Sequence, residues 1–275
     1  MVKRPKKSTS KPVDREYLSP RSAKVDFAIK LLQKKNRIKS KQFLIEGPHS
    51  LIEALNAKCL NEVFCSEDFV KKNATILEKL QLNGISTNLV HDKTLKKMSE
   101  TQQNQGVTGI ANSPVILTEK FNLKDLASIA VLYGISDPGN AGTLIRNADA
   151  AGFDAIIFSE NSVDPLNAKT VRACVGSLFN IKIFESKNIL SDIEDLNLTH
   201  KIYAADSNSK TSIYDQDLSG ATCWIFGNEA HGFNEVEIES AKKIAIPIYG
   251  KAESLNVATA AAICMYETAK SRKSK

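Results

Sequence analysis

Apolar runs and segments of helical periodicity alternate along the first part of the chain. Four apolar runs predict strands, at residues 43–47, 61–65, 85–90 and 106–111. Apolar residues at helical spacing predict helices, at residues 24–35, 49–58, 67–82 and 92–100. Because strands and helices alternate, we expect a small α/β domain over residues 25–112.

A second series of apolar runs follows residues 113–125, where the periodic pattern lapses and a linker is predicted. Strands are predicted at residues 129–134, 155–158, 181–184, 202–205 and 223–226, and helices at residues 143–151, 168–177 and 189–197. These strands are apolar throughout, which is typical of a parallel sheet covered by helices on both faces. We therefore predict a second α/β domain over residues 126–275.

The second domain is expected to end in a strand, a polar loop and a helix. The strand is predicted to begin at Ile246, the chain turns at Gly250, and the helix is predicted from Ser254 onward. Ser254 and Asn256 are good helix-start residues, and a helix N-terminus presents unpaired N–H groups and partial positive charge to a ligand. The alternative is that Ser254 caps an ordinary core helix.

The 275 residues carry a formal net charge of +6, which favours polyanionic partners. With 25% charged and 42% hydrophobic residues, the composition is that of a globular chain. The first twelve positions hold five basic residues and no acidic one: Lys3, Arg4, Lys6, Lys7 and Lys11. We expect residues 1–24 to form a basic flexible arm that binds RNA or DNA, the alternative being a solubilising tail.

Neither the cysteines nor the histidines follow a pattern that indicates a metal site. The five cysteines are scattered without a C-x-x-C pair, and the four histidines are isolated. We expect no metal and reduced thiols, mostly buried as small hydrophobes. The chain has no apolar run of the about 20 residues that span a bilayer, so a cytoplasmic protein is expected.

A polar loop, Asp137-Pro-Gly-Asn-Ala-Gly142, lies between a predicted strand and a predicted helix. In that geometry, backbone N–H groups can hold a phosphate. Asn140 and Arg146 could grip a phosphodiester and its ribose, because Arg offers a rigid donor fork. The alternative for Arg146 is a surface ion pair.

Another polar loop, Phe226-Gly-Asn-Glu-Ala-His-Gly-Phe233, also follows a predicted strand. Gly227 lets a ligand approach the backbone, and Glu229 is poorly explained as a structural residue. We interpret His231 as an exposed loop histidine. Loops at the carboxyl ends of parallel strands meet at one edge of the sheet, so the three polar loops are expected to converge.

Three segments resemble, in order and in spacing, the three motifs of the SpoU (TrmH-like) branch of the SPOUT RNA methyltransferases. They are Asp137-Pro-Gly-Asn-Ala-Gly-Thr-Leu-Ile-Arg146, Phe226-Gly-Asn-Glu-Ala-His-Gly232 and Ile246-Pro-Ile-Tyr-Gly-Lys-Ala-Glu-Ser-Leu-Asn256. Residues 162–177 are also typical of the family, and residues 19–111 resemble its substrate-binding domain, which has a ribosomal-protein L30e-like fold. The second motif usually has Gly or Arg where this chain has Ala230 and His231, a departure that leaves Glu229 intact.

The resemblance implies a fold, an assembly and a cofactor. The C-terminal domain would be a SPOUT parallel sheet with a deep trefoil knot, and the protein would be a homodimer. The cofactor would be S-adenosylmethionine, held at the positions that match the family's contacts, which are Gly227, Ile246 and Leu255. An apolar strand end beside a glycine suits an adenine ring.

The reaction implied by the resemblance is methyl transfer to a ribose 2′-hydroxyl of RNA. Arg146 would position the substrate phosphate and would not act as a neutral base, because an arginine side chain stays protonated in proteins. The residues that would orient the ribose and the loops are Asn140, Glu229, Ser254 and Asn256.

Relatives with this two-domain plan often act on large-subunit rRNA, so 23S rRNA is the expected substrate. The alternatives are a tRNA ribose methyltransferase, a base methyltransferase of another SPOUT branch, and a non-catalytic RNA-binding protein with a vestigial SPOUT domain. The intact motif residues argue against the last of these. A nucleotide-dependent oxidoreductase is disfavoured because the chain lacks a G-x-G-x-x-G fingerprint in the first loop.

Overall fold

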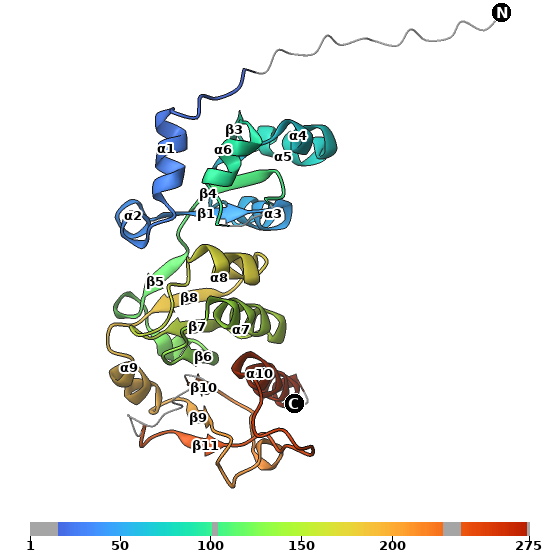
Figure 1. The fold of residues 1–275 in the computed structure, drawn as a ribbon. Helices are drawn as coiled ribbons and strands as arrows, with labels where there is room; N and C mark the ends of the chain where they lie inside the picture. Colours follow the sequence, from blue (N-terminus) through green and yellow to red (C-terminus); the bar gives the residue numbers. More distant parts are fainter. Residues whose placement is uncertain (1–15, 101–103, 228–237, 274–275) are drawn as a thin grey trace, which may run out of the picture.

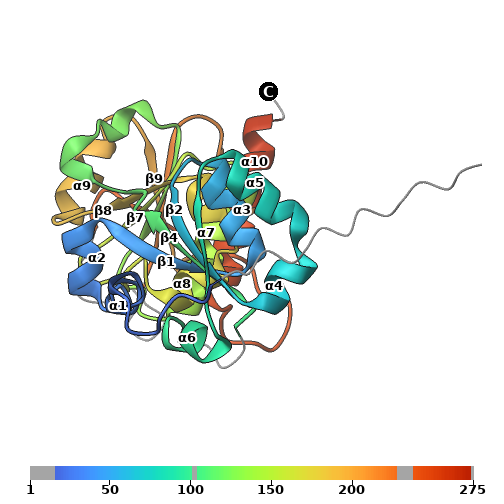
Figure 2. The ribbon, with the colours of Figure 1, turned by 90° about the horizontal axis from the view of Figure 1, so that it is seen from above.

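The computed structural model describes residues 16–100, 104–227 and 238–273 and contains two β-sheets, one above the other in Figure 1. We call residues 16–112, which hold the first sheet, the small unit, and residues 113–273, which hold the second, the large unit. Figure 2 looks down through the small unit onto the large one. The chain is therefore mixed α/β in both halves, as the sequence predicts.

The small unit has a mixed four-stranded sheet in the order β1-β4-β2-β3, with β2 and β3 parallel and the other pairs antiparallel. Its strands are β1 (Gln42–Glu46), β2 (Leu60–Cys65), β3 (Ser86–Leu89) and β4 (Val107–Asn112). Its helices are α1 (Ala23–Lys30), α2 (Lys34–Ser40), α3 (Pro48–Asn56), α4 (Glu67–Lys72), α5 (Ala74–Leu82) and α6 (Asp92–Lys97).

The large unit has a seven-stranded sheet in the order β11-β9-β10-β6-β7-β8-β5, and every neighbouring pair is parallel. Its strands are β5 (Val115–Leu117), β6 (Ser128–Leu132), β7 (Ala155–Phe158), β8 (Lys182–Glu185), β9 (Lys201–Ala205), β10 (Thr222–Phe226) and β11 (Lys242–Ile244). Its α-helices are α7 (Pro138–Ala151), α8 (Ala168–Ala173), α9 (Ile189–Leu196) and α10 (Val257–Lys273).

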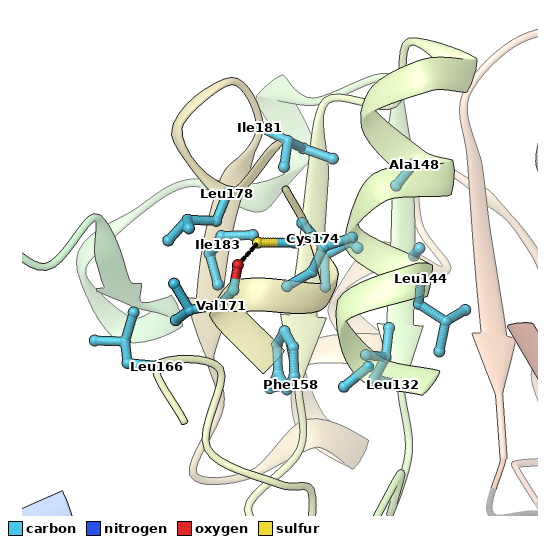
Figure 3. Packing of buried hydrophobic residues seen from close by; sticks show 14 of the residues in the cluster. Leu132, Leu144, Ala148, Phe158, Leu166, Val171, Cys174, Leu178, Ile181 and Ile183 are labelled. Atoms are coloured by element: carbon cyan, nitrogen blue, oxygen red, sulfur yellow. Dashed lines mark hydrogen bonds between the residues drawn. The ribbon is translucent and has the colours of Figure 1, made fainter. Parts of the chain in front are cut away.

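Helices cover both faces of this sheet, as the continuous apolar strands predict. Figure 1 shows α7, α8 and α10 on one side of the sheet and α9 on the other. Side chains that alternate along each strand enter two different cores: Ala130 packs with residues of α7, α8 and α10, and Ile129 packs with residues of α9. In the first core, Cys174 is buried between α7 and β8, and its thiol donates to the Val171 carbonyl at 3.0 Å (Figure 3). The expectation of reduced, mostly buried thiols is confirmed, because the five cysteines are free and four of them are buried.

The one tryptophan of the chain joins an inner strand of the sheet to the last helix. Trp224 of β10 is fully buried, and its indole N–H donates to the Thr268 hydroxyl of α10 at 2.9 Å. Thr268 in turn donates to the Cys264 carbonyl at 2.8 Å. A buried indole needs such a partner, and this bond fixes the long helix against the sheet.

The end of the predicted N-terminal arm and the predicted linker between the two domains are both more ordered than the sequence suggests. The predicted flexible arm, residues 1–24, is attached to the small unit at its end, because the Tyr17 ring stacks on His91 with centroids 4.0 Å apart and the Leu18 N–H donates to the Leu89 carbonyl at 2.8 Å. Residues 1–15 lie outside the described residues. The predicted linker 113–125 contains β5, which pairs with β8 and extends the second sheet.

The predicted strand at Ile246 is wrong, because the strand ends earlier. It is β11 at Lys242–Ile244, followed by a single bridge between Ser212 and Ala245. Ile246 then begins an irregular segment, and the helix starts at Val257 rather than at Ser254. The predicted trefoil knot includes residues 228–237, which lie outside the described residues, so the knot stays a prediction.

The packing of α7 on α8 depends on a glycine. A Cβ added at Gly142 would lie 2.5 Å from the Ala173 Cβ and 2.5 Å from the Thr170 carbonyl oxygen. We expect Gly142→Ala to lower the free energy of unfolding by about 1–3 kcal/mol, since this overlap outweighs the better helix propensity of alanine. Urea unfolding measures the change, and the exposed neighbour Thr143→Ala serves as control. Equal stability of Gly142→Ala and the natural chain would contradict the close packing.

Candidate functional site

The carboxyl ends of β6 and β10 lie side by side, because the two strands pair in parallel and the Tyr133 N–H donates to the Phe226 carbonyl at 2.9 Å. The residues that follow these strands, 133–137 and Gly227, are therefore neighbours at one sheet edge. This is the edge at which parallel α/β sheets bind ligands.

The loop after β6 is tied to the start of α7. The Asp137 carboxylate accepts the Asn140 N–H at 2.8 Å and thereby caps the helix, and Pro138 occupies its first turn. Lys169 of α8 pairs with Asp137 at 3.3 Å. The bond from Asn140, together with Lys169, lowers the pKa of the Asp137 carboxyl below its usual value. These contacts fix the position from which the Asn140 side chain leaves α7.

The first and third predicted loops meet through two asparagines. The Asn256 Nδ2 donates to the Asn140 Oδ1 at 3.2 Å, across 116 residues of sequence. The Asn256 Oδ1 accepts the Ala258 N–H at 2.9 Å, which caps α10. One side chain therefore both starts the last helix and holds the loop before it against α7.

Asn147 strengthens the same junction, although sequence reasoning did not select it. Its Nδ2 donates to the Ala258 carbonyl in the first turn of α10 at 2.9 Å. Asn140 and Asn147 are seven residues apart and so share one face of α7. That spacing was the signal that could have identified Asn147. Asp137 and Lys169 were likewise missed, because their roles depend on α8 lying beside the loop.

Arg146 projects from α7 into solvent. Its side chain is exposed and forms no ion pair with any residue in the described part of the chain. The alternative of a surface ion pair, left open by the sequence, therefore has no support among residues 16–100, 104–227 and 238–273. An exposed guanidinium on the helix that carries Asn140, without an ion pair to a described residue, is available for a phosphate.

The other predicted site residues occupy the ends of the same elements. Gly227 follows β10 and is partly exposed, Ile246 and Leu255 are half-buried in the segment between β11 and α10, and Ser254 is exposed. Ile246 packs against the core that α10 covers. Ser254 does not cap α10, since Asn256 does so. Glu229 and His231 lie outside the described residues.

Residues 16–100, 104–227 and 238–273 contain neither a metal-binding cluster nor a membrane-spanning helix. Within these ranges, no group of three or more His, Cys, Asp or Glu side chains is placed to hold a metal ion. No helix in the described part of the chain is both long and apolar enough to cross a bilayer.

Two family models match the chain, and together they cover most of it. Residues 127–266 match the SpoU rRNA Methylase family, and residues 23–109 match the MRM3-like substrate binding domain. The first match contains the three loops described above. The second coincides with the small unit.

Individual relatives give the same assignment. The chain is 33% identical over 250 residues to the 23S rRNA (guanosine(2553)-2′-O)-methyltransferase RlmP of Bacillus subtilis, covering 90% of this chain and 96% of that protein. A crystal structure of an RNA 2′-O ribose methyltransferase superposes with a TM-score of 0.77 at 26% identity, over 92% of this chain and 97% of the other. The AdoMet-bound rRNA methyltransferase from Sinorhizobium meliloti gives a TM-score of 0.74 at 27% identity, over 90% and 95% of the two chains.

Proposed function

The chain belongs to the SpoU rRNA Methylase family, and from this membership and the site we infer that it is an S-adenosylmethionine-dependent RNA 2′-O-ribose methyltransferase acting on rRNA. The observation that carries the proposal is the hydrogen bond between Asn140 and Asn256. It joins the first and third motif loops, and Arg146 of the same helix as Asn140 is exposed and forms no ion pair with a described residue.

The residues at the ends of β10 and β11 suit the cofactor. Gly227 leaves the backbone open at the strand end, and Ile246 and Leu255 offer half-buried apolar surface for an adenine ring. We propose that these three residues hold S-adenosylmethionine. When bound, S-adenosylmethionine supplies an electrophilic methyl group.

The protein's own residues must align a ribose 2′-hydroxyl, which is a weak nucleophile, and accommodate the loss of its proton. We propose that Arg146 binds the adjacent phosphate through its donor fork, because its guanidinium is exposed and unpaired among the described residues. Asn140 and Asn256, already joined to each other, would orient the ribose. Ser254 is exposed one turn before α10 and is proposed to contact the same substrate, and Glu229 keeps its proposed role in the second loop.

We assign a proposed role to each part of the chain from the domain organisation of the family. Residues 126–275 would form the methyltransferase domain and residues 25–112 the RNA substrate-binding domain, with residues 1–24 assisting through charge. We propose 23S rRNA as the substrate, because RlmP, at 33% identity, is a 23S rRNA methyltransferase. A homodimer and a cytoplasmic location are proposed with it.

A transfer assay tests this function. The purified protein should transfer labelled methyl from S-adenosylmethionine to a bacterial rRNA pool and not to a tRNA pool. Alkali-resistant sites in the product should map the label to ribose 2′-oxygens. Label in tRNA alone would retain the enzyme class and overturn the substrate, and label on a base would indicate another SPOUT branch. RNA binding without cofactor binding would favour the non-catalytic alternative.

A further inference from the structure

A basic segment of the small unit lies next to the large unit. Between Asp26 and Glu46 the chain contains six Lys or Arg residues and no acidic one. Of these, Lys34, Lys35 and Lys39 belong to α2, are exposed, and form no ion pair with any described residue. Exposed lysines that form no ion pair with a described residue are suited to a partner that carries negative charge.

One residue of α2 is buried and anchors the helix. Arg37 is only 7% exposed, and its guanidinium donates to the Leu31 and Leu32 carbonyls at 2.9 and 2.7 Å. It also donates to the Asp164 carboxylate of the large unit at 2.6 Å. The ion pair is largely shielded from solvent, because the Arg37 and Asp164 side chains are only 7% and 14% exposed. The orientation of α2 is therefore fixed relative to the large unit.

Asp164 belongs to the loop after β7, and that loop is bonded to the end of β6. The Ser162 hydroxyl donates to the Leu132 carbonyl and the Val163 N–H donates to the Ile135 carbonyl, both at 2.8 Å. Asp164 itself accepts the Leu166 N–H at 2.8 Å. A continuous set of hydrogen bonds thus connects Arg37 with the backbone that leads into the Asp137 loop.

Lys34 lies near the carboxyl end of the next strand, β8. Burial raises the pKa of Glu185 at that strand end, while Lys34 acts against this rise and Asp164 adds to it. Figure 1 shows α2 at the junction of the two units, close to β5. Since neighbouring strands are about 4.8 Å apart, the ends of β6 and β8 are separated by about 10 Å along the sheet edge. The start of α2, at Lys34, therefore lies at the same sheet edge as the candidate active site.

We propose that the exposed face of α2 binds the phosphate backbone of the RNA substrate and guides it toward Arg146, with the Arg37–Asp164 pair holding this face in position. The inference rests on the proposed function, since it takes RNA as the substrate. Lysine ammonium groups act as mobile point charges, which suit phosphates better than base edges. The surface therefore sets the path of the strand and adds affinity that does not depend on sequence.

Neutralising the three lysines tests the proposal. In the full chain, the triple variant Lys34→Gln, Lys35→Gln and Lys39→Gln should flatten the slope of log K against log salt for rRNA binding by about 2, because each phosphate contact contributes about 0.7–0.9. At moderate salt, KM for rRNA should rise about tenfold, with kcat at saturating RNA within about twofold of the natural value. The dissociation constant for S-adenosylmethionine should not change.

The matched control replaces Lys79, Lys124 and Lys182 by Gln, which removes the same charge from exposed lysines that form no ion pair with a described residue. This variant should keep most of the natural salt slope and KM. Equal effects of the two triple variants would overturn the proposal and leave only a general effect of net charge. An unaltered salt slope in the α2 variant would also overturn it. If the natural protein methylates no RNA at all, the proposed function fails first, and the two failures are distinguishable.

Discussion

Replacing Arg146 by alanine should lower kcat for RNA methylation by about 10²–10³-fold, the effect typical of removing one preorganised charge-stabilising donor. The side chain is exposed and unpaired within the described residues, so its loss should disturb no internal contact. We therefore expect unchanged stability and unchanged affinity for S-adenosylmethionine. Single-turnover transfer of labelled methyl, combined with calorimetric cofactor binding, separates these quantities.

Two companion variants sharpen this experiment. Arg146→Lys keeps the charge but loses the planar fork, and it should fall between the natural enzyme and Arg146→Ala. Lys124→Ala removes an exposed cation that forms no ion pair with a described residue, and it should leave kcat unchanged. If Arg146→Ala retained near-natural turnover, the phosphate role assigned to Arg146 would be wrong, whereas a parallel loss of cofactor binding would move the residue to the cofactor site.

Replacing Arg37 by methionine should lower the free energy of unfolding by about 3–5 kcal/mol, because it leaves a buried carboxylate without its counter-charge. Asp164 is 14% exposed in this pair, and the Leu31 and Leu32 carbonyls would lose their donors as well. Urea unfolding followed by circular dichroism measures the change.

An exposed ion pair between a basic and an acidic side chain provides the control. Lys30 and Asp26 are 2.6 Å apart, but their side chains are 59% and 60% exposed. Lys30→Met should therefore cost less than about 1 kcal/mol. The double variant Arg37→Met with Asp164→Asn should be less destabilised than the sum of its single changes, since neither charge is then left alone. Similar costs for Arg37→Met and Lys30→Met would show that the buried pair does not stabilise the contact between the units.

The alternation of apolar strands and amphipathic helices predicted the parallel sheet and the convergence of its loops. The two strands that were missed are short edge strands: β5 has three residues after Ser113 and Pro114, and β11 begins with Lys242 and Lys243. Such strands carry little hydrophobic signal, because only one side of each pairs and little of their surface is buried. Their existence depends on the neighbouring strand and not on their own composition.

The candidate site likewise contains residues that the sequence predicted and residues that it did not. Motif spacing selected Asn140 and Asn256, which the structure joins directly at 3.2 Å. It did not select Asn147 or the Arg37–Asp164 pair, whose members are 127 residues apart. Each of these contacts depends on which helix packs beside which loop. Long-range partners of this kind follow from tertiary packing, and a single sequence does not encode them as a local pattern.

Because Trp224 lies in the large unit, tryptophan fluorescence reports on the unfolding of that unit alone. The small unit contains no tryptophan, and the one indole of the chain is buried on β10, two residues before Phe226 and the Gly227 loop. Its emission reports on whether α10 remains bonded to the sheet through Thr268. Comparison of emission with circular dichroism during unfolding will therefore show whether the small unit, held by Arg37, melts together with the large unit or before it.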